Sequence, residues 1–369
     1  MLQYDPSLAL AMKNDHTTVD MYGIPVLTKG IPDEPRPGHM DPRELECVRK
    51  QADFFAKAAQ SFSAPPSLET IRDSMGFPNL NLNTVEIYMR YEEHTFGGNT
   101  VKLWIYYPRR PAGKTGRPGF LYLHGGGWIG GTPFAVENPC RLLAERADCV
   151  VFNVDYSLAP ERPYPNGFND CWNTLVHVYE HAEDYGVDRE KLGMGGDSAG
   201  GNLTAACALK DRDLGRGILK YQALLYPAVT FVTKGVPGYR WSIEDYEICE
   251  EQRALIEPGM GLGRPAKDGE DEGGMNRFYL QHGEDPADPF LSPLLAPSHR
   301  NLCRTLIAVA EFDGLRIQGE IYGKKLLEAG VDARVIRYKG VGHAFLDKLG
   351  VLPQAEDVVQ EMANDLLRL

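Results

Sequence analysis

The sequence has no excess of positive charge. Its 369 residues include 39 lysines and arginines against 51 aspartates and glutamates, which gives a formal net charge of −12. Nucleic-acid binding depends on basic surfaces that neutralise phosphates, so this balance argues against a nucleic acid as the main partner. The chain also lacks any run of eighteen apolar residues. We therefore expect no segment that spans a membrane.

Paired cysteines are missing as well. The seven cysteines are an odd number and contain no CxxC pair, a pattern that fits neither a disulfide framework nor a zinc site. The N-terminal residues show no basic segment followed by an apolar one, so we expect no signal peptide. These absences predict a soluble globular protein of a reducing compartment, the cytoplasm.

From residue 85 onward the chain alternates between β-rich and helical segments. The β-rich runs cover residues 85–91, 101–107, 119–123, 149–154, 191–195, 221–226, 305–310 and 334–338. From the third run on, helical stretches lie between and after them, at 137–148, 168–185, 199–212, 316–329 and 354–368. Near-continuous apolar strands alternating with helices predict an α/β fold, with a mostly parallel sheet covered by helices on both faces.

Two parts of the chain do not follow this alternation. Residues 1–80 have the pattern of helices and loops, with Asp41, Pro42 and Glu44 forming a helix start of the capping-box type. Apolar side chains then recur at helical spacing, at Leu45, Val48, Phe55, Ala59 and Phe62. Residues 232–290 form a long polar excursion that includes AKDGEDEGG at 266–274. We interpret this excursion as an inserted helical lid, because structureless segments of that length are rare inside a domain.

The sharpest local motif is the GxSxG sequence at 196–200, centred on Ser198. It lies between a strand-like run and a helix-like run, where a serine on a tight turn becomes exposed and flanking glycines relieve steric clashes. The alternative is a glycine-rich junction in which Ser198 is an ordinary helix cap. The motif alone does not decide between the two.

A second motif favours catalysis. His124-Gly125-Gly126-Gly127-Trp128 follows an apolar run and matches the loop type whose backbone N–H groups stabilise the oxyanion of a tetrahedral intermediate. The same stretch also fits GxGxxG, the dinucleotide fingerprint, and Asp155 ends the next strand. In that fingerprint the last glycine opens a helix. Here two prolines follow within the next nine residues, so we reject a nucleotide site.

A serine nucleophile needs a base and an acid that orients the base. His343 lies in a turn-like segment after the last β-rich run, and Asp313 directly follows the preceding run. The chain order Ser198, Asp313, His343 is the nucleophile–acid–base order of α/β-hydrolases. Glu311 is the alternative acid, and taken singly Asp313 and His343 are also compatible with a helix cap and a turn residue.

The helix at 168–185 contains a further pattern, HxxEH at 177–181, which is an inverted zinc-protease signature. His177 and His181 lie off the apolar stripe of that helix, so we interpret them as part of a solvated face. We therefore expect no metal there.

In combination these motifs resemble the bacterial hormone-sensitive-lipase-like (family IV) esterases, which have the α/β-hydrolase fold. The resemblance rests on HGGGW (124–128), VDYSLAPERPYP (154–165), GGDSAGGNL (195–203), SPLLAP (292–297), AEFDGLR (310–316) and GVGHAF (340–345). It implies Ser198 as nucleophile, His343 as base and Asp313 as its orienting acid. It also implies an oxyanion hole made by the backbone N–H groups of Gly126, Gly127 and Ala199.

The resemblance further implies a division of the chain into parts. Residues 81–369 would form the catalytic domain, and residues 1–80 together with the insertion at 232–290 would form a cap over the acyl pocket. The chain departs from the family in its acid motif, which the family usually continues as DPLRDEG and this chain writes as DGLRIQG. Two carboxylates of the family motif thus have no counterpart here. The insertion is also longer than usual.

We therefore predict a serine carboxylesterase that hydrolyses short- to medium-chain esters with water and needs neither metal nor organic cofactor. An amidase, deacetylase, lactonase or carbamate hydrolase would use the same triad. A ligand-binding receptor of this fold, as in the plant gibberellin receptors, would lack the histidine that this chain has at 343. Trp128 and Tyr156 are candidates for substrate contact. The sequence is compatible with a homodimer.

Overall fold

The computed structural model describes residues 2–59, 67–108, 116–265 and 276–369, and the side chains of 54–59 are not part of that description. The AKDGEDEGG loop, Phe62 and the side chains of Phe55 and Ala59 therefore lie outside the described residues. Within the described residues, none of the helices is both long enough and apolar enough to cross a bilayer.

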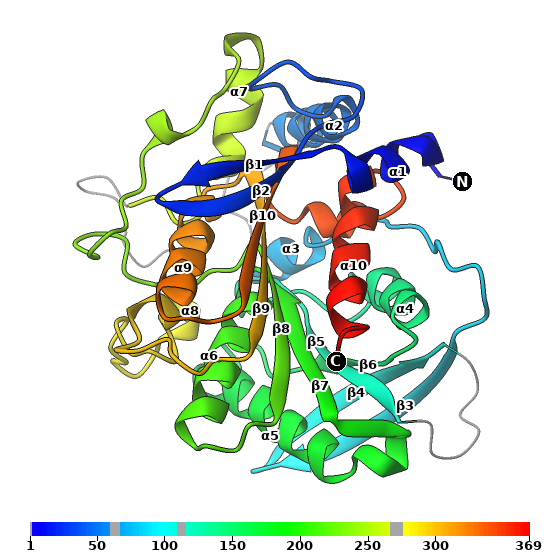
Figure 1. The fold of residues 1–369 in the computed structure, drawn as a ribbon. Helices are drawn as coiled ribbons and strands as arrows, with labels where there is room; N and C mark the ends of the chain where they lie inside the picture. Colours follow the sequence, from blue (N-terminus) through cyan, green and yellow to red (C-terminus); the bar gives the residue numbers. More distant parts are fainter. Residues whose placement is uncertain (1, 60–66, 109–115, 266–275) are drawn as a thin grey trace.

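One ten-stranded sheet forms the centre of the molecule (Figure 1). Its spatial order is β1-β2-β10-β9-β8-β7-β5-β6-β4-β3. The pairs from β2/β10 through β5/β6 are parallel, and the outer pairs β1/β2, β4/β6 and β3/β4 are antiparallel. The strands are β1 His16–Met21, β2 Ile24–Lys29, β3 Tyr88–Phe96, β4 Asn99–Tyr107, β5 Arg117–Leu123, β6 Val150–Asp155, β7 Val187–Asp197, β8 Leu219–Leu225, β9 Arg304–Phe312 and β10 Ala333–Gly342.

Helices cover both faces of the sheet. Residues alternate along β5, so Leu121 packs with helices α5, α6 and α9 on one face, whereas Phe120 packs with α4 and α10 on the other. The helices are α1 Pro6–Asn14, α2 Pro42–Ala59, α3 Leu68–Asp73, α4 Glu137–Arg146, α5 Asn166–Glu180, α6 Ala199–Asp213, α7 Arg253–Ile256, α8 Asn276–Tyr279, α9 Arg316–Glu328 and α10 Pro353–Leu366. The predicted α/β architecture is thus confirmed, with each of the eight predicted strands present. The first strand begins three residues later than expected.

The N-terminal segment is different from the prediction of helices and loops alone. Strands β1 and β2 form a hairpin whose turn residues Tyr22 and Gly23 both have positive φ, and β2 joins the sheet beside β10. Lys29 at the end of β2 is fully buried because it pairs with Asp357 and Glu361 of α10. The prediction failed here because β1 is exposed along most of its length and has no alternating apolar pattern.

The insertion at 232–290 is also less regular than the helical lid we predicted. Its described part contains only helical turns of three or four residues, at Ile243–Asp245, Glu250–Gln252, Arg253–Ile256, Glu257–Met260 and Asn276–Tyr279. The long helix at this end of the molecule is α2, which begins at Pro42 as predicted. Figure 1 shows α2 and α7 near one another at the top of the molecule, and the two helices are in contact.

Candidate active site

Ser198 occupies the sharp turn between β7 and α6. Its φ of +53° is strained for a residue with a side chain. The flanking glycines are required by space, because a Cβ at Gly200 would lie 1.9 Å from the carbonyl oxygen of Leu123 and one at Gly196 would lie 2.3 Å from the same atom. Close packing of the turn against β5 thus explains the GxSxG spacing.

Three side chains from distant parts of the sequence meet at this turn. The Ser198 Oγ lies 3.0 Å from Nε2 of His343, and Nδ1 of the same imidazole lies 2.8 Å from Oδ2 of Asp313. His343 directly follows β10, and Asp313 directly follows β9. Because the carboxyl ends of parallel strands lie at one edge of a sheet, these loops reach the same place. Glu311, the alternative acid, instead accepts a hydrogen bond from the Gly340 N–H and pairs with Lys339.

The electrostatic surroundings favour the protonated form of His343. Burial alone would lower the pKa of its imidazole, but the charge and hydrogen bond of Asp313, together with Asp197 and Asp347, raise that pKa above its ordinary value of 6.5. Asp313 is fully buried, and its Oδ1 accepts a hydrogen bond from the Leu315 N–H. The carboxylate is therefore held beside Nδ1 of His343, where its charge favours the protonated imidazole.

The glycine loop at 124–128 lies beside this turn. Gly126 and Gly127 line the same cavity as Ser198 and His343, and Ala199 is buried directly after Ser198. Among the described residues, the backbone N–H groups of Gly126, Gly127 and Ala199 have no acceptor. Unpaired donors next to a serine hydroxyl are what an oxyanion hole requires, because they gain an acceptor only when substrate is bound.

The loop is held open by backbone conformations that exclude larger residues. Gly126 has φ +126°, and a Cβ there would lie 2.1 Å from the Gly130 carbonyl oxygen. We expect Gly126→Ala to displace the loop and lower kcat on a p-nitrophenyl ester about 10²–10³-fold, the usual cost of losing an oxyanion donor. Gly98→Ala is the matched control, since Gly98 also has positive φ but has open space around it in a distant hairpin. Equal rates for the two variants would contradict this role of the loop.

Two aromatic residues near the loop have different positions. Trp128 lines the cavity and stacks on Tyr279, with ring centroids 5.0 Å apart. Tyr156, the other candidate for substrate contact, does not line the cavity. Its hydroxyl donates to the His124 carbonyl oxygen at 2.6 Å, and its ring stacks on the His124 imidazole. Burial lowers the pKa of His124 to about 4, so this imidazole is neutral. Tyr156 and His124 thus support the glycine loop from behind.

The cavity has a volume of about 1260 Å³ and lies between the sheet and the segments above it. Its walls include residues that sequence reasoning did not select, among them Met75, Phe77, Phe231, Leu315, Gln318 and Asp347. They come from the N-terminal segment, from the loops after β8 and β9, from the first turn of α9 and from the helical turn after β10. Apart from Leu315, which belongs to the AEFDGLR motif, they lie outside the motifs quoted above and reach the cavity through the way these segments pack.

The departure from the family's acid motif has a structural explanation. Where the family has proline, this chain has Gly314, and a Cβ at that position would lie 1.9 Å from the Leu262 carbonyl oxygen of the insertion. Gln318 stands where the family has glutamate, and its Oε1 accepts hydrogen bonds from the Val229 and Thr230 N–H groups. Tyr246 of the insertion donates to the backbone carbonyl of Asp313 at 2.9 Å. The long insertion thus packs directly against the loop that carries the acid.

The N-terminal segment contacts the loop that carries the base. We predicted a capping box, but Glu44 does not reach back to the start of α2. Its Oε1 accepts from the Gly342 N–H at 3.3 Å, and its Oε2 pairs with Lys348. Gly342 directly precedes His343, so Glu44 connects α2 to the histidine loop. Asp41 does cap the helix, since its Oδ1 accepts from the Arg43 N–H.

Of the two HxxEH histidines, His181 is exposed as we predicted, whereas His177 does not lie on a freely solvated face. His177 is half-buried, and its ring lies 4.2 Å from that of His94 and 4.5 Å from that of His181. Its Nε2 contacts the Tyr185 hydroxyl at 3.1 Å. The sequence could not reveal this contact, because His94 comes from the adjacent hairpin.

The GxGxxG stretch does not have the geometry of a dinucleotide fingerprint. As we expected, no helix opens at Gly130, and the next helix begins at Glu137.

The comparisons with known proteins agree with this geometry. Residues 120–347 match a family described as having the alpha/beta hydrolase fold. The chain is 32% identical to an arylesterase of Saccharolobus solfataricus over 70% of this chain and 78% of that protein. It is also 32% identical to the carboxylesterase NlhH of Mycobacterium tuberculosis over 73% of this chain and 79% of that protein. Among solved structures it resembles a hyperthermophilic esterase of the archaeon Pyrobaculum calidifontis, with a TM-score of 0.71, 28% identity, and coverage of 89% of this chain and 98% of the other.

Proposed function

The chain belongs to the alpha/beta hydrolase family that it matches over residues 120–347, and from this premise we propose that it is a serine carboxylesterase. The observation that carries the proposal is the continuous hydrogen-bonded arrangement of Ser198, His343 and Asp313 beside unpaired glycine N–H groups. Hydrolysis of p-nitrophenyl esters by the purified protein tests it. If the purified protein hydrolyses no p-nitrophenyl ester, whatever the length of its acyl chain, the assignment is contradicted.

The geometry supports acyl transfer in two halves. Ser198 Oγ attacks the ester carbonyl carbon while Nε2 of His343 takes its proton. The N–H groups of Gly126, Gly127 and Ala199 stabilise the oxyanion, and the imidazolium then protonates the departing alcohol. Water repeats the sequence on the acyl-enzyme and releases the acid. Asp313 keeps the Nδ1–H tautomer of the imidazole and stabilises its charge.

We propose that residues 42–59 and 67–80, with the described part of the insertion at 232–290, form a cap over the catalytic domain, residues 81–369. The rest of the predicted cap segment, 1–80, differs from that expectation, because β1 and β2 belong to the central sheet. Cavity-lining residues from both parts of the cap support this division, for example Met75 and Leu262. The volume of about 1260 Å³ exceeds the range of roughly 300–1,000 Å³ usual for small-molecule sites, and aromatic rings form part of its wall. We propose short- to medium-chain esters as substrates, and the large, partly aromatic cavity leaves space for an aryl group. A chain-length series of p-nitrophenyl esters measures this depth directly.

The pH dependence of the reaction follows from the raised pKa of His343. The imidazole must be neutral to accept the serine proton, so activity is lost as pH falls through that pKa. We expect kcat/KM to have an acid limb with an apparent pKa above 6.5 and a plateau at higher pH. A pH-stat assay measures this without interference from an ionising chromogenic product. A limb centred below 6.5 would mean that burial outweighs the surrounding carboxylates.

Amide, lactone or carbamate hydrolysis would use the same groups and differ in how the leaving group is protonated. Rates on an ester and an anilide with the same acyl group separate these activities from ester hydrolysis. A non-catalytic receptor is disfavoured, because His343 is present and in contact with Ser198.

A further inference from the structure

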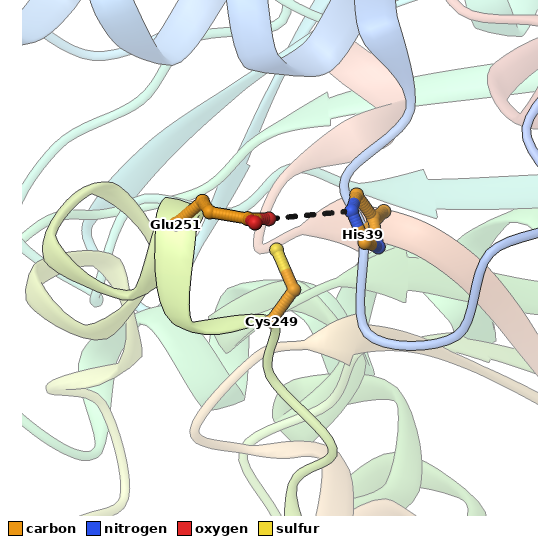
Figure 2. A group of neighbouring side chains, drawn as sticks. All are labelled: His39, Cys249 and Glu251. Carbon is orange, nitrogen blue, oxygen red and sulfur yellow. Dashed lines mark ion pairs between the residues drawn. The ribbon is translucent and has the colours of Figure 1, made fainter.

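Three side chains of types that commonly bind metals lie together outside the residues that line the cavity. A ring nitrogen of His39, the sulfur of Cys249 and a carboxylate oxygen of Glu251 are all within 4.8 Å of one another. In Figure 2 the imidazole and the carboxylate point toward each other, and the thiol lies next to the line between them. His39 comes from the segment before α2, and the other two residues come from the insertion. Within the described part of the chain, this is the one such group of three or more potential ligands.

The backbone fixes the two segments against each other. The Cys249 N–H donates to the Gly38 carbonyl oxygen at 2.9 Å, and the Met40 N–H donates to Oε1 of Gln252 at 2.8 Å. Gly38 has φ +70°, and a Cβ there would lie 2.9 Å from the Cys249 nitrogen, so glycine permits this close approach. On one segment His39 lies between these two hydrogen bonds, and on the other Cys249 forms one of them and Glu251 lies between them, so the two segments are held together without any metal.

The hydrogen bonding of His39 suits a metal ligand. Its Nδ1 lies 3.0 Å from the Pro37 carbonyl oxygen, which can only accept, so Nδ1 carries the hydrogen. Nε2 is therefore the ring nitrogen that can offer a lone pair to a metal, and it lies 3.8 Å from Oε2 of Glu251. Metal-binding histidines usually donate their other ring N–H to a carbonyl or carboxylate in this way. The His39 side chain is 13% exposed and Glu251 is 86% exposed, so an ion can reach the site from solvent.

We propose that His39, Cys249 and Glu251 bind a zinc ion. Zinc takes thiolate, imidazole and carboxylate ligands at about 2.0–2.3 Å, which places tetrahedral ligand atoms roughly 3.3–3.8 Å apart. The distance of 3.8 Å between Nε2 of His39 and Oε2 of Glu251 falls at the upper end of that range. The exposed Glu251 side chain can move to bring its carboxylate to bonding distance from the ion. Calcium and magnesium prefer oxygen ligands alone, so a thiol and an imidazole favour zinc. Water completes the fourth position, and the Cys249 thiol releases its proton to solvent.

A zinc ion here joins the two parts of the cap. It connects the segment that leads into α2 with the insertion. Its ligand Cys249 lies three residues after Tyr246, whose hydroxyl donates a hydrogen bond to the Asp313 carbonyl oxygen. Binding to the folded chain alone raises its stability by mass action. For a protein of this size, zinc at 100 times its Kd is expected to raise Tm by about 3 °C.

Cobalt titration of the full-length, chelator-treated protein tests the site. Cobalt(II) replaces zinc and gives a thiolate-to-cobalt charge-transfer absorption when cysteine is a ligand. We expect one cobalt per chain, with this absorption lost on addition of zinc and absent in Cys249→Ser. His39→Ala and Glu251→Gln should weaken zinc binding at least about 10-fold, because altering even outer-shell partners costs 10–100-fold.

Matched controls separate this site from other metal-binding groups. Cys47→Ser removes another partly exposed cysteine, and Glu250→Gln removes the neighbouring exposed carboxylate. Both variants should keep the charge-transfer absorption and the wild-type zinc affinity. The proposal is overturned if the wild type shows no thiolate absorption, if Cys249→Ser retains it, or if cobalt binding disappears in His177→Ala instead. Glu251→Gln changes only an exposed side chain, so it keeps the test independent of folding. Ester hydrolysis is not part of any readout.

Discussion

Replacing Ser198 by alanine is expected to lower kcat on p-nitrophenyl butyrate by about 10⁶-fold. Alanine removes the Oγ that lies 3.0 Å from Nε2 of His343, which is the atom that we propose attacks the ester carbonyl. The remaining groups still bind and polarise the substrate, so a small rate above that of water should persist. Single-turnover kinetics with a sensitive fluorogenic ester would detect this remaining activity.

A covalent probe provides the control for this variant. An aryl phosphonate should add one phosphonyl group to the wild-type chain and none to Ser198→Ala, as measured by intact mass. An unchanged circular dichroism spectrum and Tm would show that the variant is folded, since the hydrogen bond that Oγ makes among the described residues is the one with His343. Turnover of the folded variant within ten-fold of the wild type would exclude Ser198 as nucleophile.

The Asp313→Asn substitution is expected to lower kcat/KM by about 10⁴-fold with little change in structure. Asparagine is nearly isosteric and keeps the acceptor for the Leu315 N–H. Its amide group, however, cannot stabilise an imidazolium and favours the wrong tautomer of His343. Loss of the negative charge also removes a main contribution to the raised pKa of that histidine. The residual activity should therefore show an acid limb at lower pH than in the wild type.

Glu311→Gln is the matched control, because it makes the same chemical change two residues away. The Glu311 carboxylate accepts from the Gly340 N–H and does not contact His343, and glutamine can still accept that hydrogen bond. We expect kcat/KM within a few-fold of the wild type. If Glu311→Gln instead shows the larger loss, the acid assigned to the base would have to be Glu311.

The order of strands and helices from residue 85 onward was predictable, because the sequence patterns that indicate them are local. The eight strands from β3 to β10 appear as apolar runs, and the intervening helices have their own periodicity. The hairpin of β1 and β2 was missed, because its partner β10 lies about 300 residues further along the chain. An exposed strand such as β1 forms by pairing, and pairing between distant segments leaves little trace in local composition.

The site was predictable to the extent that its motifs impose backbone geometry. Ser198 and Gly126 sit in conformations that demand particular residues around them, so the sequence shows those positions as glycine patterns. Tyr156 is a candidate for substrate contact from its sequence, whereas in the structure it supports the glycine loop from behind. Glu44 was assigned to a helix cap, whereas it holds the loop of His343. Both side chains act through contacts with segments that no local pattern identifies.

By itself, then, the sequence determined which residues can attack, accept a proton and hold an oxyanion, because each of those tasks needs a certain residue type in a certain local turn. Only the tertiary structure decided how the cap meets the core. Gly314 replaces proline because the Leu262 carbonyl occupies that space, and His39 meets Cys249 because Gly38 lets two backbones approach. These relations depend on the closest distances between segments far apart in the chain. Such distances arise from packing the whole molecule, so no stretch of residues encodes them alone.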